Sequence, residues 1–411
     1  MANAKENFIK IESLVTFSNL IWKILLFDYH YEERIIFSCK MSSIMKILRP
    51  IFFIIIVIDL VFYTLINASY IFELAVTIDF DFKKFTGAFM LISSASMLLV
   101  KYSCIYFNKD AIQEILKFFP KEYNKTQLKE YKIDKFLTKY QKFVTFYRYF
   151  HLKFPLIFFI ILFVMGTIKA GHKIYPFEIK FPFDAFRNDV YPFLLLLVLI
   201  SHGIYTITFT FVENLTFGLT TIVATEFKIL AEKYRRIKEN PENIISCIKR
   251  QNELYDIVEN IQNIFSISFF TNFLLSSLTV CLAAFTCSIS PDIIVLIFNA
   301  VLSLVSMMQI FIQCFFGQIL YDAGIDVLNG INECGWENMK DVKLKKLIMI
   351  IIIRSQKPAV FLLLRTWKIT LEQFQSVSLN VNEVKLLNEI SFVDFEVNLL
   401  IFHFMPMVLY P

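Results

Sequence analysis

Residues 261–287 have the sequence IQNIFSISFFTNFLLSSLTVCLAAFTC, and residues 293–321 have the sequence IIVLIFNAVLSLVSMMQIFIQCFFGQILY. Neither stretch contains a single Asp, Glu, Lys or Arg. A helix needs about 20 apolar residues to cross the roughly 30 Å of hydrocarbon in a bilayer, so both are predicted to span a membrane. In lipid only helices and closed barrels satisfy all their backbone hydrogen bonds, and runs this long without alternation exclude the barrel. The sequence therefore predicts an all-α integral membrane protein.

Further apolar stretches lie on both sides of these two. The chain has 411 residues, 56% of them hydrophobic, and a mean hydropathy of +0.58. That composition leaves room for about six to eight spans and little soluble domain. The predicted spans, the last of them interrupted, are Pro50–Ile71, Phe85–Tyr106, Tyr149–Ile168, Val190–Val212, Ile261–Cys287, Ile293–Tyr321 and Leu347–Leu364. We therefore expect seven transmembrane helices.

Lysine and arginine are distributed unevenly between the segments that connect these spans. Alternate segments hold 29 of the 41 basic residues: 1–49, 107–153, 213–260 and 322–346. The opposite segments hold six: 72–84, 169–189 and 288–292. Because basic residues concentrate in cytoplasmic loops, the N-terminal segment 1–49 is predicted to be cytoplasmic. An odd number of spans then places the C-terminus outside, the reverse of a G-protein-coupled receptor.

Parts of the basic segments are predicted to be helices that continue beyond the bilayer. Aromatic and apolar residues recur at helical spacing among lysines between Leu128 and Tyr147. A second pair, 226–236 and 243–264, is separated by Asn240-Pro241, where the residue before proline resists the α conformation. These helices either present a solvated basic face or form a cytoplasmic bundle in which subunits pack.

A few ionisable residues fall inside or at the edge of the predicted spans, where charge is costly. Lys101 lies near the inner end of its span and is expected to extend toward the interface. Glu213 is expected at the interface, and His202 is expected to be a structural hydrogen-bonding group. Asp59 lies in the middle of its span and is either a buried hydrogen-bonding group or a functional one.

The sequence contains no pattern that indicates enzyme chemistry. Its five His residues lie near no Ser or Cys nucleophile pattern, and it has no HExxH and no glycine-rich phosphate loop. The seven Cys residues form no CxxC pair. We therefore expect no enzyme activity, no metal, no cofactor and no nucleic-acid partner, with the lipid bilayer as the surroundings of the chain.

The last third of the chain contains sequence motifs that resemble those of the insect odorant receptor family. Residues 354–358 are RSQKP after an apolar run, and residues 370–374 are TLEQF. Further segments that resemble the same family are CGW at 334–336, YPFE at 175–178, FPFD at 181–184, and LLSSL with CLAAF at 274–285. The resemblance covers roughly residues 40–377.

This resemblance implies a ligand-gated, non-selective cation channel in the plasma membrane of olfactory sensory neurons. The chain would be the divergent, ligand-tuning subunit of a heterotetramer with an odorant-receptor coreceptor. The resemblance further implies that the last inner loop and the first half of the last span pack subunits together, while the second half lines the pore. The implied subunit anchor comprises Trp336, Arg354, Ser355, Gln356, Lys357 and Pro358, and the implied start of the pore helix comprises Leu371, Glu372 and Phe374.

The physical chemistry of the matched residues agrees with a divided last helix. Pro358 cannot continue the helical hydrogen-bond ladder, and Arg354 and Lys357 favour the cytoplasmic side. We expect the last helix to break near Gln356–Pro358, with a spanning half after the break. The alternative is a kinked helix whose basic side chains extend to the interface.

The ligand is expected to be a small, volatile, apolar odorant, which requires an apolar pocket with one or two polar contacts. The resemblance places that pocket in the outer halves of the second, third, fourth and sixth spans. Aromatic and methionine side chains supply adaptable walls there. The candidate ligand-binding residues are Phe89, Met90, Ser93, Phe163, Met165, Phe193 and Phe298.

The sequence after Val377 differs from the pattern of the family. Five charged residues fall between Glu383 and Glu396, too many for a lipid-facing span. We therefore divide the chain into residues 1–49, a seven-helix receptor domain at 50–377, and an atypical tail at 378–411. The tail is hypothesised to come from a misassigned last exon or from read-through into an intron, which sequencing of the transcript would decide.

Two other kinds of chemoreceptor compete with the channel. A metabotropic seven-helix receptor is disfavoured by the cytoplasmic N-terminus and the missing NPxxY-like text, and a gustatory-type receptor by the missing TYxxxxxQF-type ending. A secondary transporter is disfavoured because no internal repeat is visible.

Overall fold

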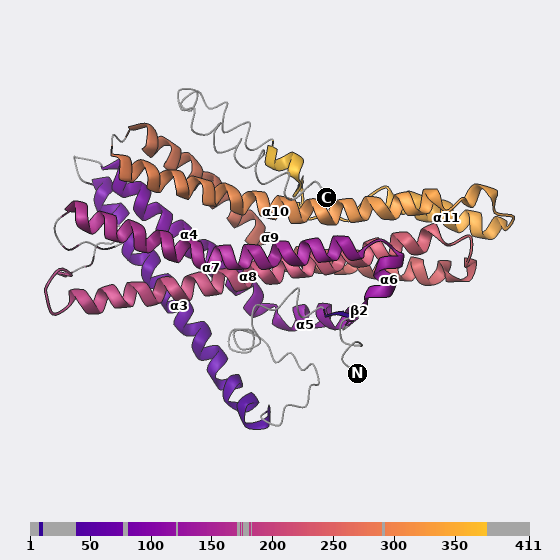
Figure 1. The fold of residues 1–411 in the computed structure, drawn as a ribbon, viewed down its shortest axis with the longest axis horizontal. Helices are drawn as coiled ribbons and strands as arrows, with labels where there is room; N and C mark the ends of the chain where they lie inside the picture. The colour runs from indigo at the N-terminus through magenta and orange to yellow at the C-terminus, as the bar shows by residue number, and fades with distance from the viewer. Residues whose placement is uncertain are drawn as a thin grey trace.

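The computed structural model describes residues 8–10, 38–76, 81–120, 122–170, 173, 175, 181, 183–289 and 292–375. Nearly all of the described chain is helical, in agreement with the predicted class. Most of the long helices run along the long axis of the molecule, and the first of them runs obliquely to that axis (Figure 1). They are α3 (Ser38–Val76), α4 (Phe82–Phe107), α7 (Asp134–Ala170), α8 (Tyr191–Arg235), α9 (Ile244–Ile289) and α10 (Ile293–Glu333).

Each of the first six predicted spans coincides with part of one long helix, and only Val190 lies just outside its helix, as the N-cap of α8. Five helical stretches among the described residues are long and apolar enough to cross a membrane: Pro50–Val76, Phe82–Phe107, Tyr191–Arg235, Pro241–Ile289 and Ile293–Asn338. The predicted third span, Tyr149–Ile168, lies within the 37-residue helix α7. The prediction of helical spans is therefore confirmed, although the count of seven is not.

Several helices extend well past the bilayer, as the helical spacing of the basic segments predicts. At 1.5 Å per residue the 46 residues of α9 cover roughly 69 Å, about twice the hydrocarbon thickness. Helix α8 is continuous from the predicted span through residues 226–235. The turn to α9 falls at Asn240 and the short 3₁₀ helix η2 (Pro241–Asn243). The extensions form a bundle that continues the transmembrane one toward the end predicted to be cytoplasmic (Figure 1).

Short elements fill the cytoplasmic segment between α4 and α7. They are α5 (Lys109–Phe118), β2 (Glu122–Asn124) and α6 (Lys125–Glu130). Strand β2 pairs in antiparallel register with β1 (Phe8–Lys10), so the N-terminal strand lies at the end of the molecule that carries the basic segments. This pairing places the N-terminal strand on the same side of the molecule as the basic segment 107–153, as the predicted orientation requires.

Aspartate side chains begin several of these helices. Asp81 accepts hydrogen bonds from two backbone N–H groups at the start of α4, and Asp292 accepts one at the start of α10. Each satisfies donors that a helix leaves unpaired in its first turn. At the end of α10 the chain turns at Gly335, whose φ of +70° lies in the left-handed region that favours glycine.

The predicted seventh span, Leu347–Leu364, is not a spanning segment. The 3₁₀ helix η3 (Trp336–Asn338) is followed by α11 (Val342–Ser355), which has only 14 residues. Helix α11 ends one residue before the predicted break at Gln356–Pro358, so the position of the break is confirmed.

Beyond the break the chain is extended, which corrects the expectation of a spanning half directly after Pro358. It forms the hairpin of β3 (Leu362–Leu363) and β4 (Trp367–Lys368), and it becomes helical again only at residue 371. Proline provides no N–H group and disfavours helix in the residue before it, which accounts for the end of α11.

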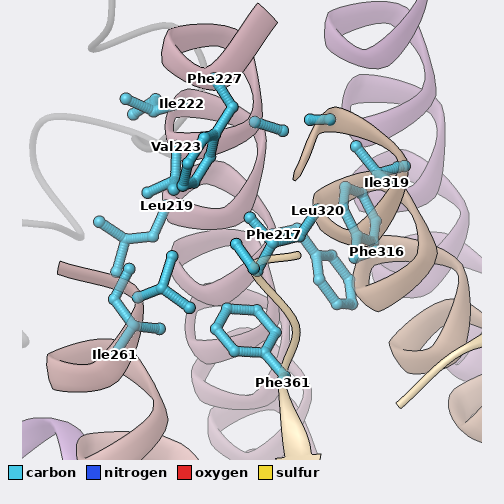
Figure 2. Close-up of a cluster of buried hydrophobic side chains, with 14 of the residues drawn as sticks. Phe217, Leu219, Ile222, Val223, Phe227, Ile261, Phe316, Ile319, Leu320 and Phe361 are labelled. Atoms are coloured by element: carbon cyan, nitrogen blue, oxygen red, sulfur yellow. The ribbon is translucent and has the colours of Figure 1, made fainter. Parts of the chain in front are cut away.

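The core of the cytoplasmic half is a cluster of aromatic and aliphatic side chains from α8, α9 and α10. Figure 2 shows Phe361, from the extended segment before β3, among residues of all three helices. Phe217 of α8 stacks on Phe316 of α10 with ring centroids 4.3 Å apart. Phe361 is 2% exposed, so the segment after the break is anchored in the main core.

Candidate functional site

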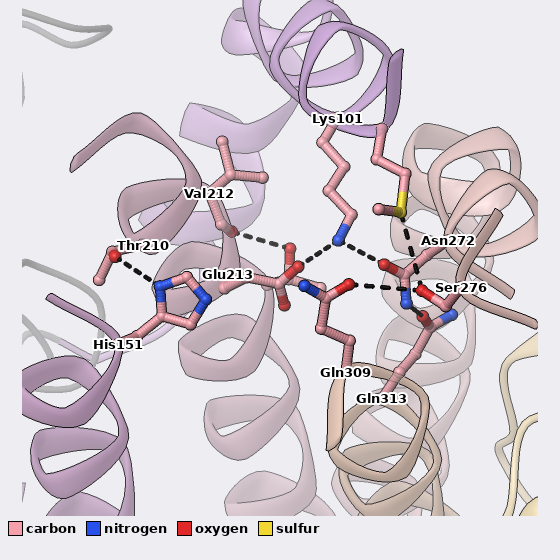
Figure 3. Close-up of polar contacts among 11 residues, drawn as sticks. Lys101, His151, Thr210, Val212, Glu213, Asn272, Ser276, Gln309 and Gln313 are labelled. Atoms are coloured by element: carbon pink, nitrogen blue, oxygen red, sulfur yellow. Dashed lines mark hydrogen bonds and ion pairs between the residues drawn. The ribbon is translucent and has the colours of Figure 1, made fainter. Parts of the chain in front are cut away.

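Lys101 and Glu213 form a buried ion pair inside the helix bundle. Lys101 on α4 is only 4% exposed, and its ammonium contacts the carboxylate of Glu213 on α8 (Figure 3). The Lys101 Nζ also donates to Asn272 Oδ1 of α9 at 2.8 Å and lies 4.6 Å from the centre of the Phe209 ring. Asn272 Nδ2 in turn donates to Gln313 Oε1 of α10 at 2.7 Å. One polar network therefore joins four helices.

This arrangement corrects the expectation that Lys101 extends to the interface and that Glu213 lies at it. The two residues are 112 positions apart, and each satisfies the other's charge within the bundle. Gln313 Nε2 has no hydrogen-bond partner among the described residues, so the network ends on an unpaired amide donor.

The contact between α4 and α9 is a row of polar side chains, here called the α4–α9 polar seam. Small hydroxyl groups let helices approach closely and hydrogen-bond in a membrane. From the outer end to the ion pair, the four contacts are Thr86–Thr286 at 2.9 Å, Ser93–Thr279 at 3.4 Å, Met97–Ser276 at 3.8 Å and Lys101–Asn272 at 2.8 Å. The seam connects the predicted ligand region to the buried ion pair.

The other ionisable residues inside the bundle have local partners. Ser201 Oγ donates to the Asp59 carboxylate at 2.6 Å, which links α8 to α3. This contact supports a hydrogen-bonding role for Asp59. The ring of His202 stacks on Tyr205 one turn along the same helix, with centroids 6.3 Å apart.

The predicted ligand-binding residues differ in how deeply they are buried. Met90 is 7% exposed and Ser93 is 2% exposed, both on the side of α4 that faces the bundle. Phe193 is 67% exposed at the outer end of α8. Phe89, Phe163 and Phe298 are half-buried, and the side chain of Met165 lies outside the described residues. The polar residue Thr279 contacts Ser93 and was not among the predicted ligand-binding residues.

A cavity of about 720 Å³ lies in the cytoplasmic half, between the α5–α6 segment and helices α8 and α9. Inside it Glu226 accepts a hydrogen bond from Tyr123 at 2.9 Å and pairs with Arg250 at 2.7 Å. Burial, followed by the nearby Glu226 carboxylate, raises the pKa of the Tyr123 phenol well above its usual value of 10. None of the predicted ligand-binding residues lines this cavity.

The predicted anchor residues pack against helices of their own chain. The Arg354 guanidinium lies 4.0 Å from the centre of the Tyr255 ring, and the Tyr255 hydroxyl donates to the Lys357 carbonyl at 3.1 Å. Gln251 donates to Ser355 at 2.8 Å. Trp336 is half-buried directly after Gly335. These contacts fix the break in the last helix against α9.

Close backbone contacts hold the segment after the break against α10. A methyl group on Gly324 would lie 2.8 Å from the Ala359 nitrogen and 3.1 Å from Pro358 Cβ, so only glycine lets this segment approach. One and a half turns earlier, Gln318 accepts a hydrogen bond from the Leu371 N–H at 3.3 Å.

The predicted start of the pore helix also packs against α10, directly after the segment that follows the break. Phe374 is 3% exposed and contacts Phe311 edge to face, with ring centroids 5.4 Å apart. Leu371 is half-buried and Glu372 is exposed. Helix α10 therefore contacts both the polar network, through Gln313, and the chain that leads into residues 371–375.

Replacing Gln262 by leucine should release the β3–β4 hairpin. The Gln262 amide donates to the Leu362 carbonyl at 2.6 Å and accepts from the Leu362 N–H at 2.7 Å, so it satisfies both backbone groups of one residue. A buried polar group left unpaired costs about 1–3 kcal/mol, and the variant leaves two. The expected result is a marked drop in the melting temperature of the purified protein.

The neighbouring amide provides the control for that substitution. Asn263 is exposed and contacts only the exposed Arg365, at 3.1 Å. Asn263→Ala should leave the melting temperature nearly unchanged. Equal effects of the two substitutions would contradict a specific role for Gln262.

Long apolar helices that pair their few charges inside the bundle define a multi-pass α-helical membrane protein. The family model described as 7tm Odorant receptor matches residues 81–380. This match covers most of the chain, and the chain therefore belongs to the odorant receptor family.

Curated relatives share part of the sequence. Odorant receptor 67c of Drosophila melanogaster is 28% identical over 192 residues, covering 44% of this chain and 47% of the relative. Putative odorant receptor 92a of the same species is 26% identical over 210 residues, covering 48% of this chain and 50% of the relative. The chain thus spans about half the length of these relatives.

Solved structures of similar fold cover nearly the whole chain. The insect olfactory receptor OR5 from Machilis hrabei in complex with eugenol matches with a TM-score of 0.71 and 15% identity, over 92% of this chain and 96% of that one. A second structure of the same receptor matches with a TM-score of 0.65 and 16% identity, over 88% of this chain and 93% of that one. At this identity the likeness concerns the fold.

Proposed function

We propose that this chain is the odorant-binding subunit of a ligand-gated, non-selective cation channel. It would act with an odorant-receptor coreceptor in a heterotetramer, in the plasma membrane of olfactory sensory neurons. Membership of the odorant receptor family is the observation that supports this proposal most directly. The similar OR5 receptor binds eugenol, a small aromatic compound, which favours a ligand of comparable size and polarity.

The odorant site of the proposal lies in the outer half of the bundle. Met90 and Ser93 supply an adaptable apolar wall and a hydroxyl group, and both face inward. Ser93 belongs to the α4–α9 polar seam, so a ligand that contacts it would compete with the Thr279 hydroxyl. Phe89, Phe163, Met165, Phe193 and Phe298 complete the proposed lining.

Subunit packing in the proposal involves the cytoplasmic end of the last helix. Helix α11 exposes apolar side chains on one side, including Met349 at 44%, Ile350 at 64% and Ile353 at 67%. An exposed apolar patch on a soluble surface indicates a protein partner. The anchor residues Arg354–Pro358 hold this helix against α9, which would keep the patch in place for a neighbouring subunit.

Substitutions in the proposed odorant site should change which ligands activate the channel. Ser93→Ala removes a hydroxyl from a buried position, and a site that hydrogen-bonds a ligand oxygen discriminates strongly against its loss. We expect at least a tenfold rise in the half-activating concentration of oxygenated odorants and little change for hydrocarbons. The measurement is a concentration–response series in oocytes that also express the coreceptor.

Phe193→Ala is the comparison for that series, because Phe193 is the most exposed of the proposed lining residues described. It should change the responses least. A uniform shift for every odorant in the Ser93→Ala series would contradict a direct polar contact.

The test of the proposed function is co-expression with the coreceptor and recording against an odorant panel. Cation currents that begin within milliseconds, without a supply of G protein, support the channel. A slow response that GDP-β-S abolishes would support a metabotropic receptor instead. Absence of any response that depends on this chain would contradict the proposal.

A further inference from the structure

One side of α7 carries three kinds of residue in succession from the cytoplasm toward the membrane. Lys135, Lys139 and Lys142 come first, with Lys135 and Lys142 exposed. Aromatic residues follow: Phe146 is 58% exposed, Tyr149 56% and Phe150 38%. Lys153, also exposed, comes after the aromatic residues. Aliphatic residues come last, namely Ile157, Ile160, Ile161, Val164 and Ile168, all between 47% and 77% exposed. We call this surface the α7 outer stripe.

Helical geometry places these residues on one side. With 3.6 residues per turn, Lys135, Lys139, Lys142 and Lys153 fall within about 60° of one another around the axis. The opposite side of the same helix is buried: Leu137 is 0% exposed, Val144 4% and Tyr147 6%. Tyr147 packs against Phe217 of α8. The outer stripe is therefore the side of α7 that faces away from its own bundle.

Within the part of the chain that the structure describes, the lysines of the stripe have no acidic partner. Among the described residues, no carboxylate lies within ion-pair distance of Lys135, Lys139, Lys142 or Lys153, although eleven such pairs form elsewhere. The nearby Glu130 is engaged by Arg236. The charge of these lysines is therefore not neutralised by any carboxylate that the structure describes.

The position of the stripe relative to the bilayer identifies that partner. Exposed tyrosine side chains, which combine an apolar ring with a hydroxyl group, mark the membrane–water interface, and this places Tyr149 near the edge of the hydrocarbon. At 1.5 Å per residue, Lys142 lies about 10 Å and Lys139 about 15 Å beyond Tyr149 on the cytoplasmic side. Lys153 lies just inside the edge, with its ammonium 5.7 Å from the centre of the Tyr149 ring. Lysine side chains at these depths reach the headgroup layer.

We propose that the basic part of the α7 outer stripe binds the headgroups of anionic phospholipids in the cytoplasmic leaflet. Lys139 and Lys142 would contact phosphate groups, and Lys153 would extend from within the interface to the same layer. The stripe continues without a break into the aromatic and aliphatic residues that face lipid, so one lipid molecule can contact headgroup-binding and chain-binding residues together. This continuity favours a membrane lipid over a soluble anion. Basic residues at such a position attract anionic lipids, and each is worth about a fivefold gain in binding.

The test uses the purified full-length protein and compares phosphatidylserine with phosphatidylcholine by native mass spectrometry. Wild type should retain phosphatidylserine in preference to phosphatidylcholine. Lys139→Gln combined with Lys142→Gln should lower that preference at least fivefold, because both charges near the headgroups are lost. Both lysines lie on the outer side of the helix, so the variant should fold.

The matched control removes two exposed lysines at the far cytoplasmic end. Lys343→Gln combined with Lys346→Gln on α11 changes the net charge equally and should leave the preference unchanged. Three results would overturn the proposal: no preference in wild type, an equal loss in both double variants, or displacement of the lipid by inorganic phosphate at a modest excess. The last result would identify a free-anion site instead.

Discussion

Lys101→Met should abolish delivery of the protein to the cell surface. The substitution leaves the Glu213 carboxylate inside the bundle without its counter-charge, and it also removes the donor to Asn272. Removing one partner of a buried ion pair costs about 3–5 kcal/mol, which is a large part of the stability of an ordinary protein. The measurements are surface labelling of intact cells and the melting temperature of the purified protein.

The double variant separates the charge from the shape of the side chains. Lys101→Met combined with Glu213→Met removes both charges at similar volume, and such replacements are often neutral or stabilising. We expect surface expression to return to at least half of the wild-type level. If the double variant is as poorly expressed as the single one, the unpaired Glu213 carboxylate is not the cause of the loss. The pair is then needed for more than mutual neutralisation.

Another lysine of α4 serves as the control. Lys83 lies 4.0 Å from Asp292 with both side chains partly exposed. Exposed pairs contribute about 0–1 kcal/mol, so Lys83→Met should have little effect on expression or melting temperature.

Gly317→Ala should eliminate odorant-evoked current. A methyl group at this position would overlap the carbonyl oxygen of Ile369, which belongs to the backbone and cannot rotate away. The segment between the hairpin and residue 371 would have to move off α10, with loss of the contact between Leu371 and Gln318. Overpacking of this kind costs about 1–3 kcal/mol, and the displaced residues lead directly into the proposed pore helix.

Gly203→Ala on α8 is the matched substitution, since a methyl group there would have no atom within 4 Å. Alanine also favours helix over glycine by up to about 1 kcal/mol. Currents should be recorded with the coreceptor and divided by surface expression for both variants. A wild-type current from Gly317→Ala would show that the segment at Ile369 can move without affecting the pore.

Much of the fold follows from features that act locally in the sequence. The charge-free stretches within α9 and α10 require a bilayer, and Pro358 ends α11 because it provides no N–H group. The hairpin after Pro358 was not predicted, because a short apolar run such as 359–364 is equally compatible with a strand and a helix. Tertiary contacts decide between them here: Gln262, 100 residues earlier, binds both backbone groups of Leu362. The division into 50–377 and 378–411 stays a prediction, and residues 376–411 lie outside the described structure.

The candidate site was less predictable, since its main contacts join residues far apart in the chain. Lys101 and Glu213 taken singly have ordinary interfacial explanations. A signal was nevertheless present: Ser93, Met97 and Lys101 follow one another at intervals of four, which places them on one side of α4. Such a side with two polar members in a span indicates a protein-facing surface rather than a lipid-facing one. Asn272 and Gln313 gave no comparable signal within their apolar stretches.

The pairing of β1 with β2 constrains the order in which the nascent chain matures. Ile9 lies opposite Tyr123, 114 positions further along. At translation rates of about 5–20 residues per second, the N-terminal strand waits on the order of ten seconds for its partner to be synthesised. During that interval the translocon must insert α3 and α4 while the amino-terminal strand has no edge to join. The sheet of β1 and β2 can therefore form only after both of these helices have been synthesised.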